Sequence, residues 1–182
     1  MKLQAWNTET TMVLLKNQYV TIIKSQVLLP NDNTIDDFYT VTIPDAVLII
    51  PITVNNQIIL KTEYRYACKE TMIECPTGMI EECEEPLHAA QRELVEETGY
   101  CSDNWTYLGP TRESPSKLTN TMHLFLAKNC ICTGEQHFDP FEQIEIMKDS
   151  MDDAIKLVMD GRITSNSSAH AILKVARMLV EA

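Results

Sequence analysis

The first third of the chain alternates short apolar runs with polar breaks, a pattern that is typical of β-strands. The breaks at Lys16-Asn17 and at 30–33, where Pro-Asn-Asp-Asn stands, consist of residues that favour turns. The pattern therefore predicts a small antiparallel β unit, built from the apolar runs at 12–15, 19–23, 27–29 and 38–43.

A second group of strands follows Pro44-Asp45. The run at 46–54 is almost wholly apolar, as in strands that are buried on both faces. Asn55-Asn56 tolerate a positive φ and predict a tight hairpin into a strand at 57–64. Further strands are predicted at 105–108, 122–127 and 142–147.

The first helix is predicted between Pro86, which suits a first helical position, and Thr98, since Gly99 offers a left-handed stop. Its apolar residues fall on one stripe that would face the core. Two further helices are predicted near the C-terminus, from Ser150 to about Gly161 and over an amphipathic segment from Ala169 to Val180. The elements together predict one α/β body.

The composition excludes some classes of binding partner but adds little to the prediction of the fold. With 182 residues, 26 acidic and 15 basic side chains, the chain has a net charge of −11. Such a charge repels phosphate backbones and anionic lipid, so we expect neither nucleic acid nor membrane as a partner. A phosphate substrate would need a metal ion as a bridge. We also expect a cytoplasmic protein, because the first residues do not resemble a signal peptide and the six cysteines show no CxxC pair.

The helix at 86–98 carries the most informative residues. Glu93 and Glu97 are four residues apart and stack on one face, with Glu96 near both. Like charges at this spacing destabilise a helix by about 0.2–0.5 kcal/mol per pair. A hard cation with oxygen ligands would compensate, and Arg92 could hold one carboxylate by a bidentate pair. The alternative is a solvated glutamate-rich face without a ligand.

The segment from Gly78 to Tyr100 resembles the Nudix box: Gly, five residues, Glu84, seven residues, Arg-Glu-aliphatic-x-Glu-Glu-x-Gly, then a hydrophobic residue. The resemblance implies a Nudix fold, a mixed-sheet α/β/α sandwich, here with the small N-terminal antiparallel β unit. It implies Mg²⁺ as cofactor, with Mn²⁺ as a substitute. The implied metal ligands are Glu93 and Glu97, Glu96 as an accessory ligand, and the backbone carbonyl of Thr77.

Beyond the box, the chain resembles the ADP-ribose pyrophosphatase and nucleoside-diphosphate-sugar hydrolase branch. Three local matches support this resemblance. Upstream, Glu63-Tyr64-Arg65 is followed by the segment from Ile73 to Gly78; downstream lies Ser114-Pro115-Ser116; and the segment from Glu142 to Ile146 resembles the one that delivers a catalytic glutamate. Arg65, a permanently charged fork suited to a diphosphate, and Glu74 are the substrate contacts expected there. An ordinary surface ion pair is the alternative for Arg65. Cys83 stands where the family commonly has glycine, and Ser116 where Pro-Gly is usual.

In this branch the N-terminal unit mediates dimerisation and helps to build the nucleoside pocket. We therefore expect residues 1–43 to form that unit in a homodimer and residues 44–182 to form the hydrolase domain. Tyr19 and Phe38 resemble the aromatic residues that sandwich adenine, where stacking contributes about 1–3 kcal/mol per base. They could equally be hydrophobic residues of the sheet.

The implied reaction is the attack of water on one phosphorus of the diphosphate of ADP-ribose or a related sugar nucleotide, giving AMP and ribose 5-phosphate from ADP-ribose. Glu142, outside the metal helix, is the expected general base, with Glu145, Asp139 and Glu96 behind it. Other Nudix substrates, namely a dinucleoside polyphosphate, coenzyme A or an oxidised nucleotide, stay open. So does a non-catalytic nucleotide-binding Nudix module.

Overall fold

The apolar runs of the sequence form the strands of two separate sheets. A computed structural model describes residues 4–134, 136 and 143–181. The chain divides into two units, one comprising Met1–Pro44 with Arg112–Thr121 and the other comprising Asp45–Thr111 with Met122–Ala182. Each unit is described by itself below.

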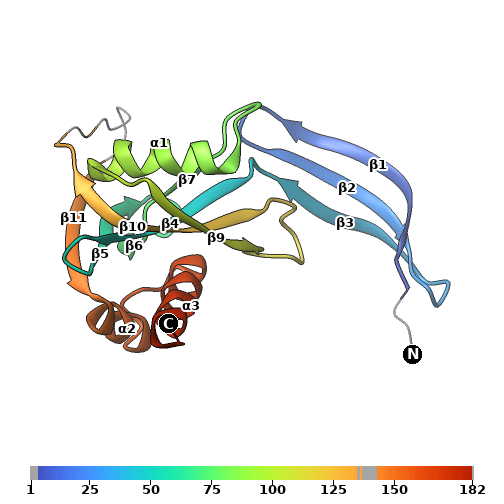
Figure 1. Ribbon diagram of the computed structural model, residues 1–182. Helices are drawn as coiled ribbons and strands as arrows, with labels where there is room; N and C mark the ends of the chain where they lie inside the picture. Colours follow the sequence, from blue (N-terminus) through green and yellow to red (C-terminus); the bar gives the residue numbers. More distant parts are fainter. Residues whose placement is uncertain (1–3, 135, 137–142, 182) are drawn as a thin grey trace. The chain divides into compact units, whose positions relative to one another are not determined.

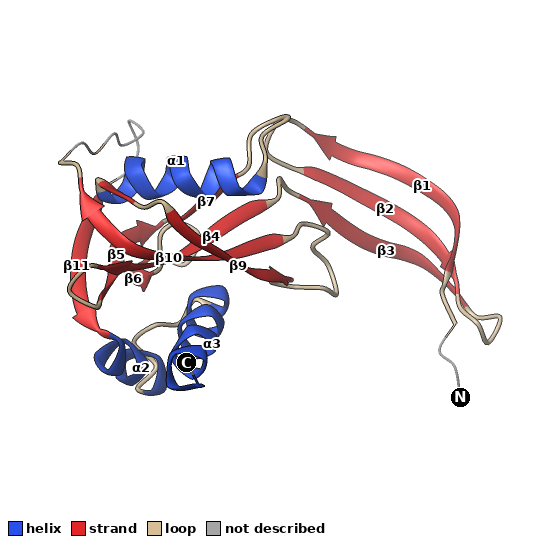
Figure 2. Cartoon of the chain, in the orientation of Figure 1, coloured by secondary structure: helices blue, strands red, loops and turns tan. Residues whose placement is uncertain are grey.

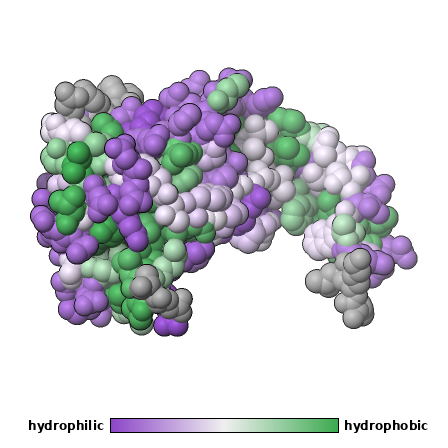
Figure 3. All heavy atoms as spheres, viewed as in Figure 1, coloured by the Kyte–Doolittle hydropathy of each residue, from purple (hydrophilic) through white to green (hydrophobic). Residues whose placement is uncertain are grey.

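The first unit is a three-stranded antiparallel sheet in the order β1-β2-β3. The strands are β1 (Asn7–Lys16), β2 (Thr21–Leu28) and β3 (Thr34–Thr42). The segment Arg112–Thr121 joins this sheet because the Val41 N–H donates to Lys117 O and the Thr119 N–H donates to Val41 O, at 2.9 and 3.1 Å. Every residue of β1 is exposed, including the apolar run from Met12 to Leu15. Hydrophobic atoms accordingly reach the surface of this unit (Figure 3).

The second unit contains an eight-stranded sheet whose central path is β11-β5-β4-β10-β8. Strands β6, β7 and β9 pair with β5, β4 and β10. Because β10 runs parallel to β4 while the other pairs are antiparallel, the sheet is mixed. The strands are β4 (Ala46–Thr53), β5 (Gln57–Arg65), β6 (Glu70–Glu74), β7 (Thr77–Met79), β8 (Tyr100–Cys101), β9 (Asn104–Thr111), β10 (Met122–Cys132) and β11 (Ile144–Ser150).

Helices cover both faces of this sheet (Figure 2), which makes the unit an α/β/α sandwich. One face carries α1 (Pro86–Thr98), and the other carries α2 (Met151–Met159) and α3 (Asn166–Glu181). Successive residues of β4 point to opposite faces, so Val47 packs with the α1 layer and Leu48 with the α3 layer. The near-continuous apolar run at 46–54 is thus explained by burial on both sides.

The predicted fold class is confirmed, and most elements lie close to their predicted places. The hairpin between β4 and β5 turns through Asn56 with φ 57°, and α1 has the predicted bounds. The short strands β6, β7 and β8 were not predicted, because segments of two to five residues carry too little periodicity. In the described part of the chain, no helix combines the length and the apolar character needed to cross a membrane.

Candidate active site

Packing of α1 sets the direction of its charged residues. Ala89, Ala90 and Leu94 are fully buried against the sheet. The helix ends where Gly99 takes a left-handed φ of 69° and its N–H donates to Val95 O. This orientation leaves the polar side of the helix facing outward, where Figure 3 shows hydrophilic side chains gathered over α1 (labelled in Figure 1).

Arg92 gathers three carboxylates of the box. Its Nε and Nη2 donate to the two oxygens of Glu84, each at 3.0 Å, so the bidentate partner of Arg92 is Glu84 of the preceding loop and not one of the helix carboxylates. Its Nη1 donates to Glu93 at 2.7 Å and to Glu96 at 3.0 Å. These hydrogen bonds, that with Glu84 above all, raise the pKa of Arg92 further above its ordinary value. Arg92 is therefore a permanent cation that orients all three acids.

The loop before α1 fixes Glu84. Its carboxylate accepts from the Glu81 N–H at 2.9 Å, and the hydrogen bonds from Arg92 lower the pKa of Glu84. Cys83 adopts a left-handed φ of 65°, a conformation that costs an ordinary residue about 1–2 kcal/mol. This backbone geometry explains why glycine is the common residue where this chain has cysteine.

Gly78 lies directly against Glu93. A Cβ atom on Gly78 would stand 1.9–2.2 Å from the carboxylate atoms of Glu93, closer than any real Cβ contact. The backbone of Gly78 itself is not in the left-handed region. The missing side chain, rather than conformational freedom, is therefore what this position requires.

Glu97 is the most enclosed carboxylate of α1, with a relative exposure of 2%. One of its oxygens contacts the ammonium group of Lys61, and the other accepts from the Thr77 N–H at 3.0 Å. Burial raises the pKa of Glu97 to about 7, against the opposing effect of Lys61 and the Thr77 N–H. Thr77 is held in turn by its hydroxyl, which donates to Val47 O at 2.7 Å.

Lys61 was not identified from the sequence. It lies in β5, where Ile59 belongs to the α1 layer, and strand alternation places Lys61, Glu63 and Arg65 on that same face. Its Nζ donates to Glu63 at 2.9 Å in addition to contacting Glu97. The available signal was a lysine in phase with buried residues of a predicted strand, which calls for an acidic partner nearby.

Arg65 and Glu74, the two residues expected to contact substrate, bind each other across β5 and β6. Arg65 Nε donates to Glu74 at 2.7 Å and its Nη1 donates to Glu63 at 2.9 Å. Burial acts to lower the pKa of Arg65, but Glu74 and Glu63 outweigh it and raise that pKa. Their contact with substrate stays a prediction.

Comparison with known proteins identifies the family of this constellation. The model of the NUDIX domain matches residues 42–158, which is more than half of the chain. The chain belongs to the Nudix family. An ADP-ribose pyrophosphatase of Bacillus subtilis (strain 168) is 33% identical over 130 residues, covering 71% of this chain and 70% of that protein.

Two further relatives of this Nudix chain extend over nearly its whole length. A methanol dehydrogenase activator of Bacillus methanolicus is 29% identical over 172 residues, covering 94% of this chain and 92% of the activator. The crystal structure of an ADP compounds hydrolase superposes with a TM-score of 0.85 at 21% identity, covering 100% of this chain and 97% of that one. The latter supports the Nudix fold.

Nudix hydrolases generally use a divalent metal, and the donor chemistry here suits one. Salt bridges join six carboxylates to only three basic side chains, Lys61, Arg65 and Arg92. Hard divalent cations prefer such oxygen donors. Among the described residues, no three acidic, histidine or cysteine side chains already surround a common point. In this arrangement Arg92 binds Glu93 and Glu96, and Lys61 binds Glu97.

The two aromatic residues expected at the nucleobase both lie in the first unit, at different heights of its sheet. Tyr19 occupies the turn between β1 and β2, while Phe38 pairs with Ser25 in the middle of β3. Phe38 makes an edge contact with Trp6, at 5.8 Å between ring centroids, and Lys117 Nζ lies 4.6 Å from its centre. A sandwich of one base between Tyr19 and Phe38 stays a prediction.

The downstream carboxylates divide into two groups. Glu142 and Asp139 lie outside the described residues. Glu145 pairs with Thr62, one residue from Lys61, and directly paired residues share a face. Its side chain is therefore on the face of the sheet opposite to Lys61 and Glu97. The neighbouring Ile146 packs with the α1 layer, as this register requires.

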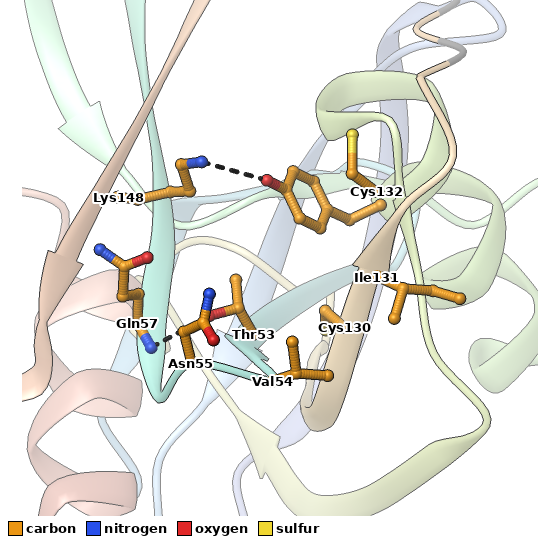
Figure 4. A pocket seen from close by; sticks show the side chains of 9 residues that line it. Thr53, Val54, Asn55, Gln57, Cys130, Ile131, Cys132 and Lys148 are labelled. Carbon is orange, nitrogen blue, oxygen red and sulfur yellow. Dashed lines mark hydrogen bonds between the residues drawn. The ribbon is translucent and has the colours of Figure 1, made fainter.

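Tyr100, the hydrophobic residue that ends the box, lines a separate pocket of about 230 Å³ (Figure 4). Its hydroxyl lies 3.3 Å from the Nζ of Lys148, which points toward it from β11. Gln57 and Cys132 also line this pocket, and none of its lining residues is a carboxylate. The side chain of Tyr100 thus makes its polar contact away from the six carboxylates bound by Lys61, Arg65 and Arg92, which we call the acid cluster.

Proposed function

We propose that this Nudix pyrophosphohydrolase hydrolyses the diphosphate linkage of ADP-ribose, giving AMP and ribose 5-phosphate, or that of a related nucleoside diphosphate sugar. The main support is that the carboxylates around α1, the helix of the Nudix box, outnumber the basic side chains that bind them. The chain is also 33% identical to an ADP-ribose pyrophosphatase. Such a site suits a polyanionic substrate only when a cation accompanies it.

The proposed cofactor is Mg²⁺, with Mn²⁺ as a substitute. Glu93, Glu96 and Glu97 would hold it, with the Thr77 carbonyl as a further ligand. The metal supplies charge neutralisation on the phosphoryl oxygens when bound. Arg92 orients Glu93 and Glu96, and Lys61 with the Thr77 N–H orients Glu97.

Glu142 is the proposed general base, with Glu96 as the second choice. A carboxylate outside the metal helix can accept a proton from the attacking water without being consumed as a ligand. The side chain of Glu96 is 40% exposed and so has access to water. Arg65 and Glu74 are proposed to meet the diphosphate, where a guanidinium fork would bind phosphate oxygens.

A substrate panel tests this proposal. ADP-ribose, UDP-glucose, GDP-mannose, diadenosine polyphosphates and NADH are incubated with the protein and Mg²⁺, and products are separated by chromatography. We expect the highest kcat/KM for ADP-ribose, release of AMP and ribose 5-phosphate, and loss of turnover in EDTA. A preference for diadenosine polyphosphates would move the protein to another Nudix branch. Binding without turnover of any compound would identify a non-catalytic module.

A homodimer is proposed as the assembly, in the cytoplasm. Strand β1 leaves Met12, Val13, Leu14 and Leu15 between 44% and 62% exposed, and an apolar strand of this kind gains from being covered. Tyr19 and Phe38 would then contribute to the nucleoside pocket. Light scattering at micromolar concentration should give about twice the chain mass of 20.7 kDa. A mass of one chain would contradict both the dimer and the shared pocket.

A further inference from the structure

Lys61 is the largest side chain of the described structure that is fully buried, with a relative exposure of 1%. Burying an ammonium group is costly unless it is paired and hydrogen-bonded. Both of its ion-pair partners are carboxylates of the candidate site: Glu97 on α1 and Glu63 on its own strand. The Lys61 ammonium group is therefore paired with two carboxylates beneath the acid cluster.

The strand does not by itself require a lysine at this position. Ile59, two residues earlier on the same face, is fully buried in the α1 layer, and Ile146, paired with Lys61 in β11, packs there too. An apolar residue would continue this pattern. Burying an ammonium group there instead costs desolvation free energy. We attribute the lysine at this position to its ion pairs with Glu97 and Glu63, which offset that cost.

The two carboxylates around the Lys61 ammonium group indicate its role. The carboxylates of Glu63 and Glu97 are directed at one buried point, which Lys61 Nζ fills. A divalent ion prefers the same oxygen donors that an ammonium group binds. An ammonium group and a metal ion cannot occupy one point, so they are alternatives for the position between these two acids.

We propose that the Lys61 ammonium group is a resident cation of the acid cluster, which fills beside Glu97 and Glu63 a position that a metal ion would otherwise take. The proposal rests on the metal dependence given above as part of the proposed function. Lys61 acts through Glu97 and is therefore a positioning residue. It keeps Glu97 in place in the metal-free protein and leaves the chain with one metal position fewer than its carboxylates could support.

The test removes the positive charge of Lys61 and measures how many Mn²⁺ ions each chain binds. Lys61→Met removes the ammonium group at similar length, and Lys61→Ala, measured in parallel, leaves more room for a hydrated ion. Mn²⁺ alone is titrated at pH 8 and followed by electron paramagnetic resonance, and thermal unfolding is recorded in EDTA and in Mn²⁺. We expect each variant to bind one more Mn²⁺ per chain than the parent. We also expect a Tm several degrees below the parent in EDTA and a Mn²⁺-induced rise at least twice that of the parent.

Two controls separate this role from a merely structural one. Lys148→Met removes an exposed ammonium group outside the acid cluster and should leave both the Mn²⁺ count and the Tm of the parent unchanged. Leu94→Ala creates a cavity under α1 and should lower the Tm in EDTA without enlarging the Mn²⁺-induced rise.

An unchanged Mn²⁺ count in the Lys61 variants would overturn the proposal, and so would their failure to fold in Mn²⁺ as well as in EDTA. Failure of the proposed function has a different signature. In that case the parent itself would neither bind Mn²⁺ nor hydrolyse any nucleoside diphosphate derivative, whereas an active parent with equal Mn²⁺ counts would remove the role of Lys61 alone.

Discussion

Replacing Gly78 with alanine is expected to lower turnover of ADP-ribose by about 10²-fold while the protein stays folded. The new methyl group would overlap the Glu93 carboxylate, which stands 1.9–2.2 Å from the position of the added Cβ. The end of a glutamate side chain can swing away at little cost in stability. A displacement of about 1 Å in a positioned group, however, costs on the order of 10²-fold in rate.

The measurement is kcat with saturating Mg²⁺, together with the Tm of each protein. Gly161→Ala is the matched control, since Gly161 has a left-handed φ of 70° and open space around it. That variant should lose stability through backbone strain and keep its turnover. Parent-like turnover in Gly78→Ala would contradict this prediction, because it would show that the reaction does not depend on the place of Glu93 against Gly78.

Replacing Glu142 with glutamine is expected to lower turnover by roughly 10²–10⁴-fold, the usual contribution of a positioned acid or base. Substrate affinity should change little, because the amide keeps the size of the carboxylate. A magnesium titration separates the proposed role from that of a metal ligand. If Glu142 held metal, high Mg²⁺ would partly restore the rate.

Glu145→Gln is the natural control for this experiment. Its register with Thr62 places it on the face of the sheet away from Lys61 and Glu97, so we expect parent-like turnover. If Glu142→Gln were fully active and Asp139→Asn inactive, the base would lie on the same segment at a different residue. If both were active, Glu96 on the box helix would be the next residue to replace.

Local sequence signals predicted most of the fold. The bounds of α1 depend on Pro86 and Gly99, whose backbone preferences act within a residue or two and need no tertiary context. The burial of β4 on both faces could be predicted from its unbroken apolar run. The three-residue strand β7 could not be predicted in this way, because so short a strand forms only through its pairing with β4.

The acids of the box were likewise determined by the sequence, through their spacing on one helix. Their environments were not. Glu97 is buried against Lys61 while Glu96 is partly exposed beside Arg92, although the two are adjacent in the chain. That difference follows from which side of α1 packs against the sheet, a property of the whole unit.

Lys61 shows most clearly which contacts the sequence alone could not predict. Helix periodicity could group Glu93, Glu96 and Glu97, because they share one element. No local pattern could join Glu97 to a lysine 36 residues earlier, since that contact depends on how β5 and α1 are layered. The sequence by itself therefore determined the family, the helix and its acids. Only the tertiary structure decided that Lys61 is the buried cation beneath them, because burial is set by neighbours that are distant in the chain.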